Sequence, residues 1–126
     1  MDATTAAILK PWFPALDLAR VRIVTRGPGC WFVRNVLRQG AMTLAPYVFF
    51  GRDAFDPAHA KSLALVAHEL RHVEQYGQMG HLRFLTTYLR DRIRAGHYSP
   101  ELRLEAPCYA LQRVVREALI QQGIPE

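Results

Sequence analysis

Ala67-His68-Glu69-Leu70-Arg71-His72-Val73-Glu74-Gln75-Tyr76 is the segment with the strongest structural signal in the chain. It contains His-Glu-x-x-His inside a run whose apolar residues recur at helical spacing, which predicts an amphipathic helix. Residues four apart lie on one face of a helix, so the imidazoles of His68 and His72 can bind a single Zn²⁺. Glu69 then lies beside the open metal position, where its carboxylate can take a proton from zinc-bound water. The segment therefore predicts a zinc helix with Glu69 as general base.

A catalytic zinc normally has three protein ligands, so a third ligand must lie elsewhere in the chain. Glu105 is the preferred candidate, because it lies on the polar flank of a downstream predicted helix with small residues beside it. Glu101, one turn earlier, is the competing carboxylate, and a downstream histidine is a further alternative. Tyr109, one turn after Glu105, can support a ligand by a hydrogen bond. A different register would place Arg103 at the ligand position and weaken zinc binding.

Hydrolysis of a peptide also requires donors that stabilise the developing oxyanion. His97 and Tyr98 lie between the second and third predicted helices and are the candidates for this catalytic role. Capping or packing at the helix ends is the alternative interpretation for both residues.

The rest of the chain divides into strands followed by helices. Strands are predicted at residues 21–24, 30–33 and 41–50, and Pro46 assigns the last one to a sheet edge because proline cannot donate to a ladder. Helices are predicted at 57–77, 82–95 and 101–122. The first begins at Asp56-Pro57 and ends at Gly77. The second carries a stripe of four apolar residues, Leu82, Leu85, Leu89 and Ile93. This order predicts an α+β fold.

Composition is typical of one globular domain. The chain has 126 residues, of which 50% are hydrophobic and 21% charged, and no linker divides it, so we expect a single domain over 1–126. The most apolar stretch, 41–50, is about half the length that crosses a bilayer. No signal peptide is recognisable, so a cytoplasmic location is expected for the protein, with Cys30 and Cys108 reduced. The net charge of +5 is spread along the chain and carries no nucleic-acid motif.

The stretch from Ala67 to Gln112 resembles the gluzincins, zinc metallopeptidases whose third ligand is glutamate, and most closely short bacterial zincin-like domains. The resemblance lies in four blocks: His68-Glu69-Leu70-Arg71-His72-Val73-Glu74-Gln75, Phe84-Leu85-Thr86-Thr87-Tyr88-Leu89, Gly96-His97-Tyr98, and Glu105 to Tyr109. It implies a minimal zincin-like fold: a small antiparallel or mixed sheet, with an edge strand above the metal cleft, packed on about three helices. It further implies Zn²⁺ as cofactor, a peptide or protein substrate held along that strand, and Glu69 as general base.

Two function classes follow. The first is a zinc metallopeptidase in which His68, His72 and Glu105 hold the metal and Glu69 moves the proton. The second is a noncatalytic zinc-binding or protein-interaction domain on the same scaffold. An enzyme requires an open cleft above the metal, whereas a fourth protein ligand would close a structural site. Neither a membrane nor a nucleic acid is an expected partner, and the sequence leaves the substrate and the oligomeric state open.

Overall fold

The computed structural model describes residues 1–52 and 55–126. The elements follow in the order α1 (Ala3–Leu9), β1 (Arg22–Val24), α2 (Pro28–Asn35), β2 (Ala41–Leu44), β3 (Tyr47–Phe50), α3 (Ala60–Met79), α4 (His81–Ala95) and α5 (Ala106–Gln121), with two short 3-10 turns between α1 and β1. Five helices and a three-stranded mixed sheet in the described part of the chain confirm the expected α+β class and its small zincin-like form. None of the described helices is both long enough and apolar enough to cross a membrane.

The sheet has the order β1-β3-β2, with β1 parallel and β2 antiparallel to β3. The expectation of one edge strand over 41–50 is therefore wrong for Tyr47–Phe50, which forms the central strand. Leu44 pairs with Tyr47, so Ala45 and Pro46 form the turn between two strands. Proline has no N–H to donate, and it therefore ends β2 where the chain reverses. Only β2 lies at the edge next to α3.

The predicted strand at 30–33 is instead part of α2. Gly27 precedes the helix with φ of 101° and Pro28 occupies its first position. A glycine followed by proline is common in turns but equally well opens a helix. Cys30 and Val33 are buried one turn apart, whereas Trp31 and Phe32 between them are exposed. A spacing of three residues between the buried positions is the helical period rather than the strand period.

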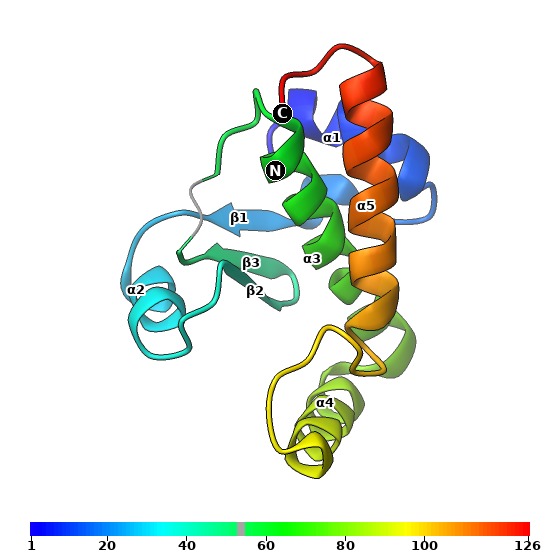
Figure 1. Cartoon of the computed structure of the whole chain (residues 1–126). Helices are drawn as coiled ribbons and strands as arrows, with labels where there is room; N and C mark the ends of the chain where they lie inside the picture. Colours follow the sequence, from blue (N-terminus) through cyan, green and yellow to red (C-terminus); the bar gives the residue numbers. More distant parts are fainter. Residues whose placement is uncertain (53–54) are drawn as a thin grey trace.

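Helix α3 lies between the sheet and α5, and it contributes twelve buried residues along its length (Figure 1). It begins at Ala60, three residues after the predicted start, because Asp56 caps a separate turn by accepting a hydrogen bond from Ala58 N at 3.0 Å. The backbone N–H of Ala60 donates to the carbonyl of Pro125 at 2.7 Å, so the C-terminal segment caps this helix. Gly77 lies within α3, which ends at Gly80 with φ of 80°.

Helix α4 does not pack against the molecule through its apolar stripe of Leu82, Leu85, Leu89 and Ile93. Phe84 is its buried residue and joins Tyr76 and Leu104 in a small core, separate from the main core around α1, the sheet and α3. The apolar stripe is exposed, with Leu82 at 79%, Leu89 at 59% and Ile93 at 69%. Helix α5 begins at Ala106, not at 101, because residues 100–105 form turns. Its buried residues are Cys108, Val115 and Leu119.

Candidate metal centre

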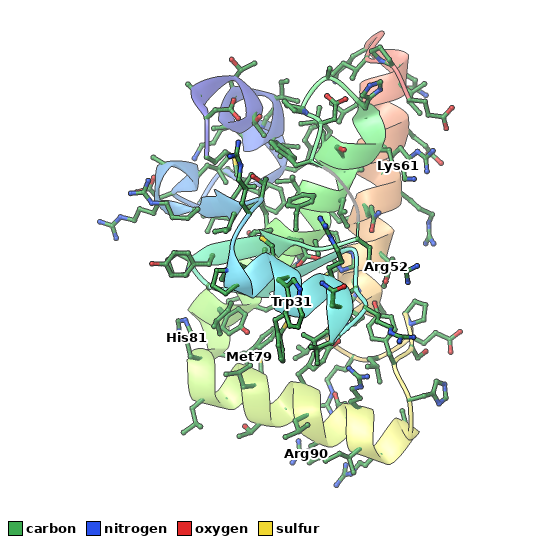
Figure 2. All side chains as sticks on the ribbon, turned by 90° about the vertical axis from the view of Figure 1, so that its left-hand side faces the viewer. Trp31, Arg52, Lys61, Met79, His81 and Arg90 are labelled. Atoms are coloured by element: carbon green, nitrogen blue, oxygen red, sulfur yellow. The ribbon has the colours of Figure 1, made fainter. Side chains whose placement is uncertain are left out.

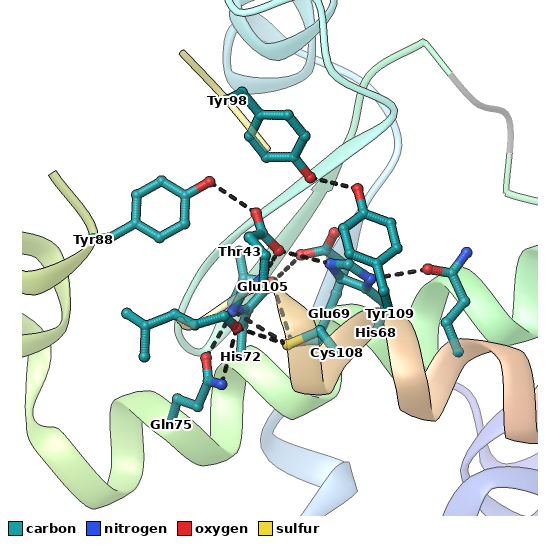
Figure 3. A network of polar contacts seen from close by, with 12 residues as sticks. Thr43, His68, Glu69, His72, Gln75, Tyr88, Tyr98, Glu105, Cys108 and Tyr109 are labelled. Carbon is teal, nitrogen blue, oxygen red and sulfur yellow. Dashed lines mark hydrogen bonds and ion pairs between the residues drawn. The ribbon is translucent and has the colours of Figure 1, made fainter. Parts of the chain in front are cut away.

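His68 and His72 project from the face of α3 that meets the start of α5, and both are buried, with 4% and 6% of their surface exposed (Figure 3). Each ring lies edge-on to an aromatic ring: His68 to Tyr109, with centroids 4.5 Å apart, and His72 to Phe84, with centroids 5.7 Å apart. These contacts hold the two imidazoles in fixed orientations.

The outer nitrogen of each imidazole is bound by a glutamine. His72 Nδ1 lies 2.9 Å from Gln75 Oε1, and His68 Nδ1 lies 2.9 Å from Gln112 Oε1. The orientation of Gln75 is fixed, because its Nε2 donates to the carbonyl of Leu104 at 3.0 Å. A glutamine oxygen only accepts, so Nδ1 of His72 must carry the proton. The Nε2 nitrogens of both rings are thereby directed toward the centre of the site.

Glu105 reaches the same centre from the N-terminal boundary of α5. It is 4% exposed, and its Oε1 lies 3.1 Å from His68 Nε2 and 2.9 Å from His72 Nε2. Burial by itself would raise the pKa of Glu105, but the hydrogen bonds from the two histidines lower it well below the usual range. Two Nε2 nitrogens and a carboxylate oxygen thus converge on one point. In the metal-free protein the imidazole N–H groups donate to Glu105, and without those protons the same three atoms could bind a metal ion.

The donor set fits a metal ion. With ligand bonds of about 2.0–2.1 Å, neighbouring donors of a tetrahedral zinc lie about 3.3 Å apart, close to the spacing observed here. A buried group of His68, His72, Glu105 and Cys108, with donor atoms within 4.8 Å of one another, could hold a metal ion. We call these four residues the metal group. In the metal-free protein, burial would lower the pKa of His72, but hydrogen bonds with Cys108 and Glu105 outweigh it and raise that pKa to about 11.

Cys108 lies to one side of this convergence point. Its Sγ is 3.6 Å from Nδ1 of His72, the ring nitrogen that faces Gln75, and it donates to the carbonyl of Leu104 at 3.3 Å. Burial raises the pKa of the Cys108 thiol, which keeps it protonated. The three donors that face one another directly are therefore the two Nε2 atoms and Glu105 Oε1.

Glu69 is buried beside the histidines and is fixed by the edge strand. Thr43 Oγ1 donates to Glu69 Oε2 at 2.5 Å and also contacts the Glu69 carbonyl at 3.2 Å. Tyr76 donates its hydroxyl to the carbonyl of Thr43 at 3.1 Å, which ties β2 to α3. Burial and the charge of Glu69 raise the pKa of Tyr76 to about 12. The carboxylate is thus held on α3 next to the metal group without belonging to it.

Three tyrosines form the wall opposite α3. Tyr88 of α4 donates to Glu105 Oε2 at 2.8 Å, which leaves Oε1 for the centre. Tyr98 and Tyr109 share a short hydrogen bond between their hydroxyls (Figure 3). Burial raises the pKa of each of the three, so all are neutral donors at physiological pH. The pair formed by Tyr98 and Tyr109 uses one of its two hydroxyl protons internally and keeps one for a ligand.

An open cleft of about 530 Å³ lies above these residues. One wall is the segment 37–43, which includes the first three residues of β2, and the other is α4 through Phe84, Leu85, Tyr88 and Arg92. The floor residues among the lining are His68, Glu69, His72, Tyr76, Glu105, Tyr98, Tyr109 and Gln112. Backbone groups alternate along an antiparallel pair, and the bond from Gly51 N to Gly40 O fixes that alternation. The backbone groups of Ala41 and Thr43 therefore face outward from the sheet.

The predicted site residues fall into two groups. His68, Glu69, His72 and Glu105 come together, and Tyr98 lines the same cleft, but His97 is exposed and is not among the described residues that line it. Glu101 is exposed, and Arg103 pairs with Asp91 at 2.9 Å instead of facing the metal group. The sequence alone did not indicate the contacts of Thr43, Gln112, Tyr88 and Gln75 in the site. Gln75 follows His72 by three residues, which was the available signal for its contact.

The fold and the metal group define a small zincin-like domain. Residues 1–80 match the model of the eCIS core domain, which covers more than half of the chain, and the protein belongs to this family. That match includes all of α3 with its two histidines and Glu69, and it ends before Glu105. Neither the curated proteins nor the solved structures compared with the chain gave a match.

Proposed function

We propose that the protein is a zinc-dependent metallopeptidase of the gluzincin type. The observation that carries this proposal is the convergence of His68 Nε2 and His72 Nε2 on Glu105 Oε1, at 3.1 and 2.9 Å, beneath an open cleft that Glu69 also lines. Two imidazoles and one carboxylate are a typical donor set for catalytic zinc, which keeps a fourth position open. When bound, zinc would supply a Lewis acid that polarises a carbonyl and lowers the pKa of water.

The chain's own residues account for the proton transfers. Glu69 accepts a proton from the attacking water and returns it to the leaving amine, while Thr43 holds the carboxylate toward the cleft. The free hydroxyl proton of the Tyr98 and Tyr109 pair is the donor we assign to the developing oxyanion. The outward backbone groups of Ala41 are suited to pair with an extended peptide, whereas the Thr43 carbonyl already accepts a hydrogen bond from Tyr76. His97, which lies outside the cleft, has no part in this assignment.

Replacing Glu69 by glutamine tests the proposal. Glutamine keeps the shape and can still contact Thr43, but it cannot accept the proton, so hydrolysis should fall by about 10²- to 10⁴-fold. The zinc content should stay at that of the wild type, because Glu69 is not a ligand. Products from casein and from a mixed peptide library are identified by mass spectrometry. Glu74→Gln is the matched control and should retain activity, because Glu74 lies on the same helix, half-buried and paired with Arg71 outside the cleft lining.

Two outcomes would contradict the enzyme proposal. Activity that Glu69→Gln leaves unchanged must come from another site or a contaminant. A zinc-loaded wild type that cleaves nothing in the library favours the second candidate, a noncatalytic metal-binding domain. The observation that favours this candidate is the presence of Cys108 within the same four-residue group, because a fourth protein ligand would close the metal site.

A further inference from the structure

Two arginines line the cleft on opposite walls. Arg38 lies in the segment before β2, and Arg92 lies on α4, one turn beyond Tyr88. Both side chains are exposed, and within residues 1–52 and 55–126 neither takes part in any of the ion pairs. They are therefore available to bind an anionic group.

The acidic residues of the cleft do not neutralise these arginines. Glu105 is occupied by His68, His72 and Tyr88, and Glu69 is bound to Thr43. Both carboxylates are buried at the metal group, whose positive charge they would offset. The remaining charge that a bound peptide meets is that of Arg38 and Arg92. The cleft thus presents a positive potential, which low-dielectric walls strengthen.

Arg38 has a backbone conformation that favours glycine. Its φ of 54° is the one positive value among the described residues other than glycine. The turn is fixed on both sides, because Leu37 N donates to Phe32 O at 3.1 Å and Gln39 N donates to Val33 O at 3.0 Å. An arginine here is less favourable for the backbone than glycine, and the same turn places its guanidinium at the cleft. Such outliers concentrate at functional sites.

The directions of β2 and α4 place both arginines at the same end of the cleft. At the other end, His81 Nε2 lies 2.7 Å from the carbonyl of Ala45, where β2 finishes and α4 begins. Figure 2 shows the helix running from His81 toward Arg90, and Arg92 is the last residue of α4 among those that line the cleft. On the opposite wall, Arg38 precedes the start of β2. The positive charge is therefore concentrated away from the turn between β2 and β3.

We infer that the cleft selects peptides with a carboxylate on the C-terminal side of the bond that is cut. This inference rests on the proposed function. Antiparallel pairing is the more stable arrangement for a peptide added to β2. Because β2 runs from the Arg38 end toward Ala45, an antiparallel peptide runs the opposite way, and its C-terminal half lies between Arg38 and Arg92. The carboxylate comes from an Asp or Glu side chain or from the end of the substrate chain.

Binding to the zinc-loaded Glu69→Gln protein tests the inference without cleavage. Four fluorescent peptides share one apolar centre: one with two Glu on its C-terminal side, one with Gln in their place, one with two Glu on its N-terminal side, and a neutral one with a free C-terminal carboxylate. The first three are capped at both ends. Fluorescence anisotropy should show the first binding about tenfold more tightly than the second, as two partly exposed charge pairs typically provide.

The arginine variants identify the source of the preference. Arg38→Gly and Arg92→Gln should each reduce the preference for Glu over Gln to about threefold, and Arg38→Glu with Arg92→Glu should reverse it. Arg90→Gln is the matched control, because Arg90 extends from α4 away from the cleft (Figure 2). Circular dichroism checks that each variant is folded. Tighter binding of the neutral peptide with the free carboxylate would assign the carboxylate to a chain end.

Several results would overturn the inference. These are equal binding of the Glu and Gln peptides, a preference for Glu on the N-terminal side, failure of all four to bind, and an equal effect of Arg90→Gln. Failure of the proposed function is a separate result. In that case the Glu69→Gln protein shows the predicted preference, but the wild type leaves the preferred peptide intact.

Discussion

Replacing Gln75 by methionine tests a residue that orients a proposed metal ligand, His72, without being a ligand itself. Methionine nearly preserves the length and volume of glutamine, but it removes the acceptor for His72 Nδ1 at 2.9 Å and the donor to Leu104 O at 3.0 Å. Gln75 is only 5% exposed, so water does not readily replace these contacts. The two losses should appear in two different measurements.

The first expected effect is on zinc affinity. Losing a hydrogen bond that orients a ligand typically costs about 10- to 100-fold in metal affinity. At about 1.4 kcal/mol per factor of ten, this corresponds to about 1.4–2.8 kcal/mol of binding free energy. The second effect is on the metal-free protein, in which the Leu104 carbonyl retains only the weak donor of Cys108. Its free energy of unfolding should fall by about 1–2 kcal/mol.

Zinc affinity is measured by titration against a chromogenic chelator, and the free energy of unfolding by urea denaturation of the metal-free protein. Gln78→Met is the matched control, because Gln78 lies on the same helix with its side chain exposed. It should change neither quantity. A folded Gln75→Met protein with the zinc affinity of the wild type would refute the assigned role of Gln75.

Two further predictions concern the same centre. Because the pKa of His72 is raised to about 11, the metal-free protein holds a proton there at pH 8, and zinc binding should release about one proton per ion, measured by calorimetry in buffers of different ionisation enthalpy. An unshifted imidazole would release almost none. The associated stability of the metal-free protein is complete below the ordinary value of 6.5 and is lost as pH rises through about 11. Cys108→Ala should retain one zinc per chain by metal analysis, and a clear drop would instead make Cys108 a ligand.

Helix α3, which we call the metal helix, could be predicted from sequence because its signal is local. His68, Glu69 and His72 fall within five residues, and the helical period alone places both histidines on one face. Glu105 was predicted by its polar position and small neighbours, and the structure places it, rather than Glu101, at the histidines. The α+β class followed from the order of the elements. These features depend on short-range patterns that the fold preserves.

The remaining features depend on contacts between distant residues. Thr43 is 26 residues from Glu69, and Gln112 is 44 residues from His68, and no local pattern links either pair. The four apolar residues of 30–33 are too few to distinguish a strand from a helix, and burial of Cys30 and Val33 decided for the helix. Pro46 lies in a turn because β3 pairs with β2 on one side and with β1 on the other, and residues 41–50 alone do not indicate this pairing.

Helix α4 differs from the other long helices in how little holds it to the molecule. Figure 1 shows it below the body formed by the sheet, α3 and α5. Its anchors are the small core of Phe84, Tyr76 and Leu104 and the polar contacts of His81, Tyr88 and Asp91. Segments with few buried contacts have the lowest free energies of local opening. The wall of the cleft can therefore move while the metal helix, fixed by the main core, stays in place. Such a movable wall would admit an unfolded polypeptide from the side, without requiring that a chain end be threaded through.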